Sequence, residues 1–391
     1  MNKTLFKLLS IINRFFPRNK HIWVSGKITS WEYDNNPPVF FDNSKYFYLF
    51  LINNTKEKVY WLSSSQKEID LLKSMGLPVV RFPSVKGIFL VLRAKFSFHH
   101  YGPDQIDDIL QRGMIQLDFW HGTPLKKIRY DVVEKPEEKH DFYHDFMNKN
   151  SREYVSSTSK FLSDTILKRA FLVEDEQLLN FGYPRTDIFA LNEQENLAFC
   201  QKYAGGLLEY IHMAKQFSKV FIYMPTFRDN DPGFLAKANI DFERLSKALK
   251  TIDGVLFLKL HPLTKLPEVQ RKDNIIQIPN DVDIYPFLMH THYLITDYSS
   301  IYFDYLLLNK EIIFIPYDYD DYIKNRELYF DYDSVTPGVK YYSFDDFIDN
   351  LVKIDLLNYE NERKKLISLL YDEYDFDASE KTYGYLKDKY C

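Results

Sequence analysis

The chain has 391 residues, of which 45% are hydrophobic, and this is enough apolar material for about two domains with cores of their own. Its formal net charge of -5 gives no reason to expect nucleic acid as a partner of the whole molecule. The two cysteines lack C-x-x-C spacing and the 13 glycines form neither a dinucleotide-binding fingerprint nor a P-loop, which excludes a thiolate zinc site and both of these nucleotide-binding motifs.

The first 31 residues contain six lysine and arginine side chains but no acidic one. Apolar residues recur there at helical spacing opposite the basic ones, which predicts an amphipathic basic helix over residues 1–20. Such a helix either lies in the headgroup plane of a membrane or packs on the domain that follows it. Polar residues interrupt the apolar run, so we expect no cleaved secretory signal, and no run in the chain nears the roughly 20 residues that cross a bilayer. The side chains expected at a membrane surface are Lys3, Lys7, Arg14, Phe15 and Phe16.

From residue 21 onward, short strand-like runs alternate with helical stretches, a pattern typical of βαβ units and a parallel sheet. Strands are expected at residues 21–24, 58–62, 78–82, 95–99 and 114–119, and again at 219–224, 255–260, 275–277, 293–296 and 311–315. Helices lie between them, for example at 42–53 and 66–74. We therefore predict an α/β fold with two doubly wound Rossmann-like domains, over residues 21–195 and 196–391.

A histidine follows the strand at residues 114–119, in the sequence Trp120-His121-Gly122-Thr123-Pro124. Ligands of doubly wound folds bind beyond the carboxyl ends of the strands, so His121 can work as a base there near neutral pH. The alternative is a structural histidine held by hydrogen bonds. Lys126 and Lys127 come next and add positive charge suited to phosphate, unless they are ordinary solvated surface.

Polar residues also follow three strands of the second series. Thr226 and Arg228 come after the strand at 219–224, where Arg228 can fork onto a phosphate or onto a structural carboxylate. His261 follows the strand at 255–260, so histidines stand at two strand ends.

The strand at 293–296 runs into Asp297, Ser299 and Ser300, where small hydroxyl residues open a helix. Backbone N–H groups at a helix start make an anion site, and a plain serine N-cap is the other interpretation.

Taken in order, these motifs resemble the CDP-glycerol glycerophosphotransferase family, the polyol-phosphate transferases of teichoic-acid and capsule synthesis. The blocks that carry the resemblance are residues 120–127, 225–230, 261–262 and 297–304, and those that extend it along the chain are 42–46, 59–62, 182–187 and 306–310. The resemblance implies a GT-B architecture, with the two Rossmann-like domains facing a cleft. It also implies a CDP-glycerol or CDP-ribitol donor, held mainly by the C-terminal domain, and a lipid-linked polyol-phosphate or glycan acceptor. Peripheral attachment to the cytoplasmic face of the cell membrane is part of the same expectation, and favours the membrane interpretation of residues 1–20.

The reaction implied by the resemblance is attack of an acceptor hydroxyl on the donor's β-phosphate, with CMP leaving. His121 matches the histidine proposed as the base, and His261 the one that stabilises charge on the pyrophosphate. Asp297, Ser299 and Ser300 match a D-Y-S-S motif expected to hold phosphates. Arg228 is a donor-site candidate on electrostatic grounds, with Thr226 beside it. No metal ligand and no cofactor follow from these motifs, and a need for a divalent cation is left open.

Two departures from the family pattern, at residues 25–28 and in extra residues at 32–39, fall on the expected acceptor side. They leave open which polyol is transferred and whether one unit or many are added. Two other functions are compatible with parts of the pattern. A GT-B glycosyltransferase would use a UDP- or GDP-sugar, and a non-enzymatic wall-polymer-binding protein would tolerate replacement of both histidines.

Overall fold

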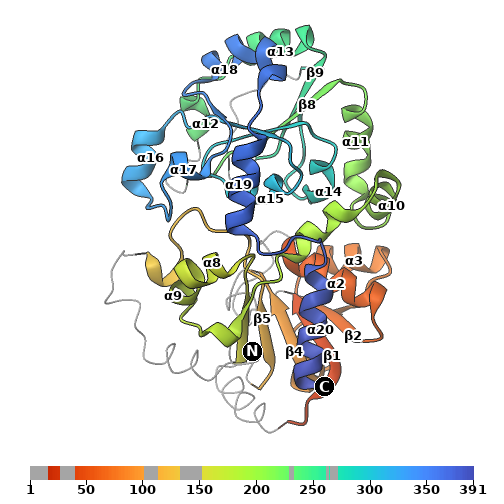
Figure 1. Cartoon of the computed structure of the whole chain (residues 1–391). Coiled ribbons are helices and arrows are strands. Elements are labelled where there is room, and N and C mark those ends of the chain that lie inside the picture. The colour runs from red at the N-terminus through yellow and green to blue at the C-terminus, as the bar shows by residue number, and fades with distance from the viewer. Residues whose placement is uncertain are drawn as a thin grey trace. The chain divides into compact units, whose positions relative to one another are not determined.

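The computed structural model describes residues 16–26, 40–100, 113–132, 152–228, 233–260, 264 and 272–391. The chain divides into two compact units, shown in Figure 1. The first comprises Met1–His121, Arg129–Ala190 and Tyr371–Cys391, and the second comprises Gly122–Ile128 and Leu191–Leu370. Each unit is built on a parallel β-sheet with helices between its strands, which confirms the predicted α/β class and its two Rossmann-like domains.

The sheet of the first unit has seven parallel strands among the described residues, in the order β3-β2-β1-β4-β5-β6-β7. These strands are β1 (Asn19–Gly26), β2 (Lys58–Ser63), β3 (Val79–Arg81), β4 (Ala94–His99), β5 (Ile115–Asp118), β6 (Arg152–Ser156) and β7 (Leu178–Leu179). The helical segments are α2 (Asp42–Asn54), α3 (Gln66–Ser74), α4 (Val85–Arg93), η2 (Arg129–Asp131), α8 (Lys160–Leu162), η3 (Ser163–Leu167), α9 (Lys168–Phe171), η4 (Asp175–Gln177), η5 (Pro184–Ala190) and α20 (Ala378–Tyr390). Because β4 and β5 are adjacent and parallel, the residues that follow them meet at one edge of the sheet.

Local sequence explains where several of these elements begin and end. The Ser65 hydroxyl caps α3 by accepting from the Glu68 N–H, and the Ser84 hydroxyl caps α4 by accepting from the Gly87 N–H at 3.0 Å. Strand β1 ends at Gly26, whose φ is +113° and where a Cβ atom would lie 2.0 Å from the carbonyl oxygen of Leu62. Only glycine fits this close approach of two strands.

The sheet of the second unit has six parallel strands among the described residues, in the order β10-β9-β8-β11-β12-β13. These strands are β8 (Lys219–Tyr223), β9 (Gly254–Leu258), β10 (Ile275–Gln277), β11 (Tyr293–Thr296), β12 (Glu311–Phe314) and β13 (Val339–Lys340). The helical segments are α10 (Glu193–Tyr203), η6 (Gly205–Leu207), α11 (Leu208–Ala214), α12 (Phe234–Lys237), α13 (Phe242–Thr251), α14 (Tyr285–Leu288), α15 (Ile301–Leu306), α16 (Tyr319–Asn325), α17 (Tyr332–Val335), α18 (Phe344–Asn350), η7 (Leu351–Leu356) and α19 (Glu360–Leu370). Central strand β8 lies between β9 and β11, so the residues after all three strands share one edge of the sheet.

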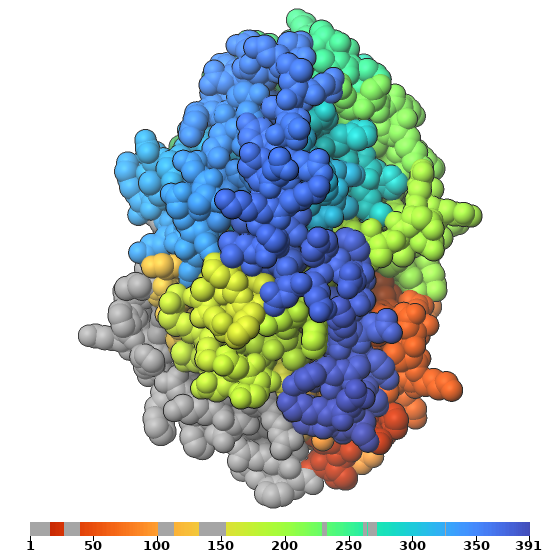
Figure 2. All heavy atoms as spheres, in the orientation of Figure 1, coloured from red at the N-terminus to blue at the C-terminus, as the bar shows by residue number. Residues whose placement is uncertain are grey.

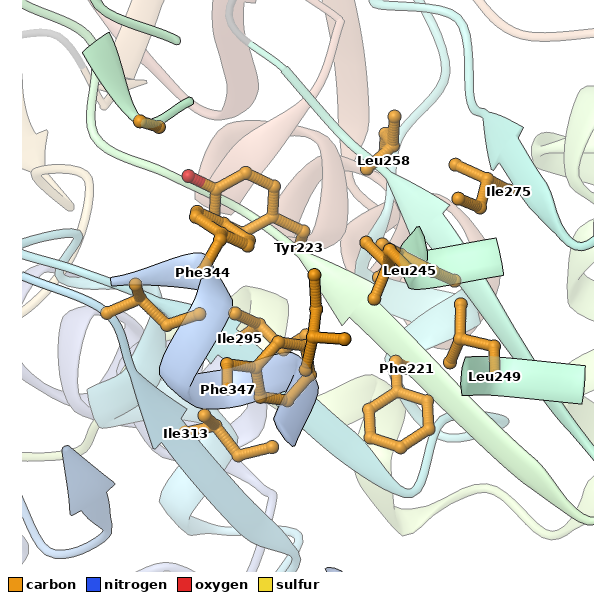
Figure 3. Packing of buried hydrophobic residues seen from close by; sticks show 14 of the residues in the cluster. Phe221, Tyr223, Leu245, Leu249, Leu258, Ile275, Ile295, Ile313, Phe344 and Phe347 are labelled. Atoms are coloured by element: carbon orange, nitrogen blue, oxygen red, sulfur yellow. The ribbon is translucent and has the colours of Figure 1, made fainter. Parts of the chain in front are cut away.

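A large apolar cluster packs one face of the second sheet against helices α13 and α18. Figure 3 shows Phe221 and Tyr223 of β8 and Ile295 of β11 directed toward the side chains of these two helices. Phe221 is fully buried and stacks on Tyr293, with ring centroids 4.6 Å apart. This packing fixes the strands whose ends carry the polar motifs.

Every strand predicted from the sequence is present, with ends shifted by no more than two residues. Strands β6, β7 and β13 were not predicted. Two of them contain only two residues, and the third begins with an arginine and a glutamate, so none has the run of apolar residues by which the others are recognised.

The C-terminal helix α20 belongs to the first unit, although we expected residues 196–391 to form a single domain. Figure 2 shows the dark blue C-terminal residues between the yellow-green and the orange-red parts of that unit. Tyr383 of α20 contacts the rings of Trp23 and Phe50, and Lys387 forms an ion pair with the buried carboxylate of Glu57 at 2.9 Å. Contacts between residues more than 300 positions apart therefore decide where this helix lies.

The helix predicted over residues 1–20 lies mostly outside the described residues, as do Lys3, Lys7, Arg14 and Phe15. Phe16 is described and is partly exposed. In the part of the chain that is described, no helix is long and apolar enough to cross a membrane.

Candidate active site

His121 follows β5 at the edge of the first sheet, beside the residues that follow β4. Its Nδ1 atom lies 3.3 Å from the carbonyl oxygen of His100, and the Nδ1 atom of His100 lies 2.8 Å from the hydroxyl of Ser44. A carbonyl oxygen can only accept a hydrogen bond, so the proton of a neutral His121 ring is on Nδ1 and the lone pair is on Nε2. His121 is partly exposed, whereas His100 is fully buried.

The surroundings of His121 favour its neutral form. Burial is the main cause that lowers the pKa of His121 below its ordinary value of 6.5, and the Arg185 guanidinium adds to it. Asp42, Asp118 and the hydrogen bond to His100 act in the opposite direction and are outweighed. A neutral imidazole with its lone pair on Nε2 is the form that can take a proton from a hydroxyl group.

Two further side chains, Arg185 and Asn43, bind the backbone around His121, and Asp42 binds Arg185. The Nη1 atom of Arg185, in η5, donates to the carbonyl oxygen of His121 at 3.0 Å and to the Asp42 carboxylate at 2.8 Å. The Asn43 side chain donates to the carbonyl oxygen of Trp120 at 2.9 Å and accepts from the backbone N–H of Arg185 at 3.1 Å. The sequence analysis gave none of these three residues a role, although each lies in one of the blocks that extend the family resemblance along the chain.

Asp118, at the end of β5, supports the same turn from within the sheet. Its carboxylate accepts from the backbone N–H of Trp120 at 2.8 Å and pairs with Arg129 at 3.2 Å. Burial alone would raise the pKa of Asp118, but His99 and Arg129 hold it at about 2. The carboxylate is therefore ionised at neutral pH and serves as a fixed hydrogen-bond acceptor.

In the second unit, Arg228 is held between two carboxylates. Its guanidinium donates to both oxygens of Asp318 at 2.9 Å, to Asp297 at 3.0 Å and to the carbonyl oxygen of Thr226 at 2.6 Å. Burial opposes its charge, but Asp297 and Asp318 raise the pKa of Arg228 above its already high ordinary value. Of the two alternatives left open by the sequence, the structure shows the pairing with structural carboxylates.

Asp297 connects the ends of β8 and β11. One of its oxygens accepts from the backbone N–H groups of Thr226 and Tyr298, at 2.8 and 2.5 Å, while the other accepts from Arg228. Both Asp297 and Thr226 are buried, and the Thr226 hydroxyl has no hydrogen-bond partner in the described structure. The structure thus brings together Thr226, Arg228 and Asp297, three of the residues predicted for donor binding.

Ser299 and Ser300 follow this cluster and are both partly exposed at the start of α15. The Ser300 side chain makes no capping hydrogen bond to the helix, which differs from a plain serine N-cap.

The two adjacent lysines have different surroundings, both in the second unit. Lys127 is half-exposed and pairs with Glu327 at 2.8 Å. Lys126 lies near Asp297, Arg326 and Arg228. Burial lowers the pKa of Lys126 to about 8. The two arginines lower this pKa further, whereas Asp297 raises it. Lys126 is therefore a partly buried cation beside the Arg228 cluster, whereas Lys127 belongs to a surface ion pair.

His261 lies outside the described residues. Among the residues that are described, no group of three or more histidine, cysteine, aspartate or glutamate side chains could hold a metal ion.

Comparison with known proteins gives one consistent family. The sequence model of the family described as CDP-Glycerol:Poly(glycerophosphate) glycerophosphotransferase matches residues 16–385. The chain is 28% identical over 362 residues to the teichoic acid glycerol-phosphate transferase of Staphylococcus aureus, which covers 90% of this chain and 87% of that protein. It is 34% identical over 244 residues to the teichoic acid poly(ribitol-phosphate) polymerase of Bacillus spizizenii, which covers 60% of this chain and 37% of that longer protein.

The fold matches a solved structure of the wall teichoic acid polymerase TagF. The TM-score is 0.76 at 22% identity, and the match covers 99% of this chain and 94% of that one. At this identity the comparison shows a common fold.

Proposed function

Because the chain belongs to the CDP-glycerol:poly(glycerophosphate) glycerophosphotransferase family, we propose that it transfers a polyol phosphate from a CDP-activated donor. The donor is CDP-glycerol or CDP-ribitol, and the acceptor is a hydroxyl group of a lipid-linked teichoic-acid or capsule-type polymer. The names of the relatives support this choice, since they include transferases of both glycerol phosphate and ribitol phosphate.

In the proposed reaction, the acceptor hydroxyl gives its proton to Nε2 of His121 as its oxygen forms a bond to the β-phosphorus of the donor. The bond between that phosphorus and the bridging oxygen breaks, and CMP leaves with the electron pair. A positioned general base contributes about 10²–10⁴-fold to such a step.

The observation that carries this proposal is the state of His121. It stands at the carboxyl end of β5, its Nδ1 proton is used in the hydrogen bond to His100, and its pKa is lowered. A base requires a lone pair on a ring nitrogen, and the neutral His121 ring, which is partly exposed, carries one on Nε2.

The donor's phosphates are assigned to the second unit. Lys126 is the cation we propose for them, with the hydroxyls of Thr226, Ser299 and Ser300, because it is a partly buried cation with two arginines nearby. A phosphate there would offset the repulsion among these positive charges. His261 is proposed to stabilise charge on the same pyrophosphate. Arg228 and Asp297, already paired with each other, are proposed to position this region, and Lys127 is assigned no direct role.

We propose that the enzyme works at the cytoplasmic face of the cell membrane, attached peripherally. The excess of basic over acidic residues in positions 1–31 supports this, since each basic side chain near an anionic lipid surface contributes about 1 kcal/mol.

The experiment is CMP release from CDP-glycerol and CDP-ribitol, with a lipid-linked polyol-phosphate acceptor, in the presence and absence of a chelator. We expect His121→Ala and His261→Ala each to lower kcat by about 10²-fold or more, while His212→Ala, an exposed histidine of α11, leaves it unchanged.

Turnover of a UDP- or GDP-sugar with no CMP release would instead identify a glycosyltransferase. Full activity of both histidine variants would contradict the proposed mechanism.

A further inference from the structure

The turn that carries His121 is conformationally demanding. Trp120 has φ of +54° and Gly122 has φ of +124°, so residues on both sides of His121 are in the left-handed region. For a bulky residue such as tryptophan this backbone conformation costs on the order of 1 kcal/mol or more, and it persists only where surrounding contacts hold it. The position of the imidazole therefore depends on groups that bind this backbone.

Two side chains bind successive carbonyl groups of the turn. Asn43 donates to the carbonyl of Trp120 at 2.9 Å, and Arg185 donates to the carbonyl of His121 at 3.0 Å. Arg185 and Asn43 are themselves joined through the backbone N–H of Arg185, and Arg185 is joined to Asp42. The arginine side chain is 4% exposed, so water does not weaken these bonds.

We propose that Arg185 is a positioning residue for the base, acting with Asp42 and Asn43 to fix the His121 turn and the charge around its imidazole. This rests on the proposed function only in that His121 is taken to be the base. The arginine contacts the backbone carbonyl of His121 and not the reacting atoms, so it acts through His121.

The titratable and charged groups facing His121 come from four parts of the first unit. Asp42 lies on α2, His100 follows β4, Asp118 ends β5 and Arg185 lies in η5. Arg185 disfavours the protonated imidazole and Asp42 favours it. Removing one charge or the other must therefore change the proton affinity of His121 in opposite directions, whereas a general loosening of the fold has no reason to do so.

The test uses the full-length protein with Arg185→Ala, Arg185→Lys and Asp42→Asn. Arg81→Ala is the matched control, because Arg81 is an exposed arginine on β3 of the same unit. Titration of His121 is followed by NMR with isotope-labelled histidine, and its signal is assigned from a His121→Asn sample. We expect the midpoint to rise in Arg185→Ala, to fall in Asp42→Asn, and to stay near the wild-type value in Arg185→Lys and Arg81→Ala.

CMP release from CDP-glycerol is the second readout. In Arg185→Ala we expect kcat to fall by up to about 10²-fold, with the KM of the donor unchanged, since a misplaced catalytic group costs about that much. The acidic limb of the pH–rate profile should move in the same direction as the NMR midpoint, and Arg185→Lys should recover part of kcat.

The two proposals fail in different ways. If the wild type releases no CMP, the proposed function is wrong, yet the titration still measures the coupling between Arg185 and His121. If the wild type is active but the His121 midpoint is the same in Arg185→Ala and Asp42→Asn, the positioning role is wrong. Should Arg185→Ala fail to fold, as judged by circular dichroism, the charge-retaining Arg185→Lys and the isosteric Asp42→Asn still decide the outcome.

Discussion

The carboxylate of Asp187 accepts a hydrogen bond from the backbone N–H of Ser379 at 2.9 Å, and its other oxygen accepts from the N–H of Ala378 at 3.0 Å. Asp187 therefore caps the start of α20. Because Asp187 lies in the same short segment, η5, as Arg185, one turn of chain binds both the C-terminal helix and the backbone of His121. Within the first unit, the docking of α20 and the position of the base are connected through η5.

The first prediction concerns the pH dependence of this cap. Burial raises the pKa of Asp187 to about 7, with Asp377 adding to it, even though the hydrogen bonds from Ser379 and Ala378 oppose the shift. The pKa of this carboxyl group is higher in the folded than in the unfolded protein, where it is near 3.8. Its contribution to stability is therefore complete only when the pH is below about 3.8. Between that pH and about 7, the free energy of unfolding falls by up to about 1.4 kcal/mol per pH unit.

Asp187→Asn removes this titration, because an amide does not ionise. Thermal unfolding of both proteins at pH 5, 6 and 7 should show the variant gaining stability relative to the wild type as pH rises. A difference in melting temperature that stays constant over this range would contradict the raised pKa. Asp175→Asn, at an exposed aspartate of the same unit, is the control.

The contrast between α20 and the strands shows what sequence patterns can and cannot establish. Strand runs such as residues 293–296 are local and apolar, so their positions follow from the residues themselves. The unit to which α20 belongs depends instead on distant contacts, such as the ion pair of Lys387 with Glu57 across more than 300 residues. Such a long-range pairing cannot be predicted from the local pattern of apolar and polar residues.

The site divides in the same way. A histidine after a strand is visible in the sequence, so His121 was found. Arg185 and Asp42 were not identified, because they come close to His121 only when η5 and α2 pack beside it in the folded protein. An arginine in a Tyr-Pro-Arg sequence does not by itself indicate a functional role. Arg228 was found but its partners were not, since Asp318 lies 90 residues away.

The second prediction concerns the buried charge cluster of the second unit. Arg228→Ala leaves Asp297 and Asp318 without their cation in a buried site, and loss of one member of such a cluster costs about 3–5 kcal/mol. Chemical denaturation should therefore show a large loss of stability. Arg244→Ala provides the comparison, because Arg244 also binds two carboxylates, Asp345 and Asp349, but on the surface. Equal losses in the two variants would mean that burial of Arg228 does not determine its contribution.

The third prediction separates the two adjacent lysines. Lys126→Ala should raise the KM for CDP-glycerol by about 10- to 100-fold, because a hydrogen bond to a charged group is worth about 1.5–3 kcal/mol. Lys127→Ala should change this KM by less than about threefold, since Lys127 forms an ion pair with Glu327 at the surface. Steady-state kinetics over a range of donor concentrations measures both values. A larger effect at Lys127 than at Lys126 would reverse our assignment of the phosphate contact.

The fourth prediction is the pH profile of the wild-type enzyme. A base must be unprotonated to act, so kcat/KM falls as pH drops through the pKa of the base. Burial and Arg185 lower the pKa of His121 below 6.5, and the acidic limb of the profile should therefore lie below the range of an ordinary histidine. Titration of His121 should leave kcat/KM nearly independent of pH between 7 and 8.

Measurement of kcat/KM for CDP-glycerol from pH 4.5 to 8 tests this prediction. Circular dichroism at each pH separates loss of activity by unfolding from loss by protonation of the base. A limb centred at pH 7 or above would show that another group supplies the base or that His121 is charged in the resting enzyme.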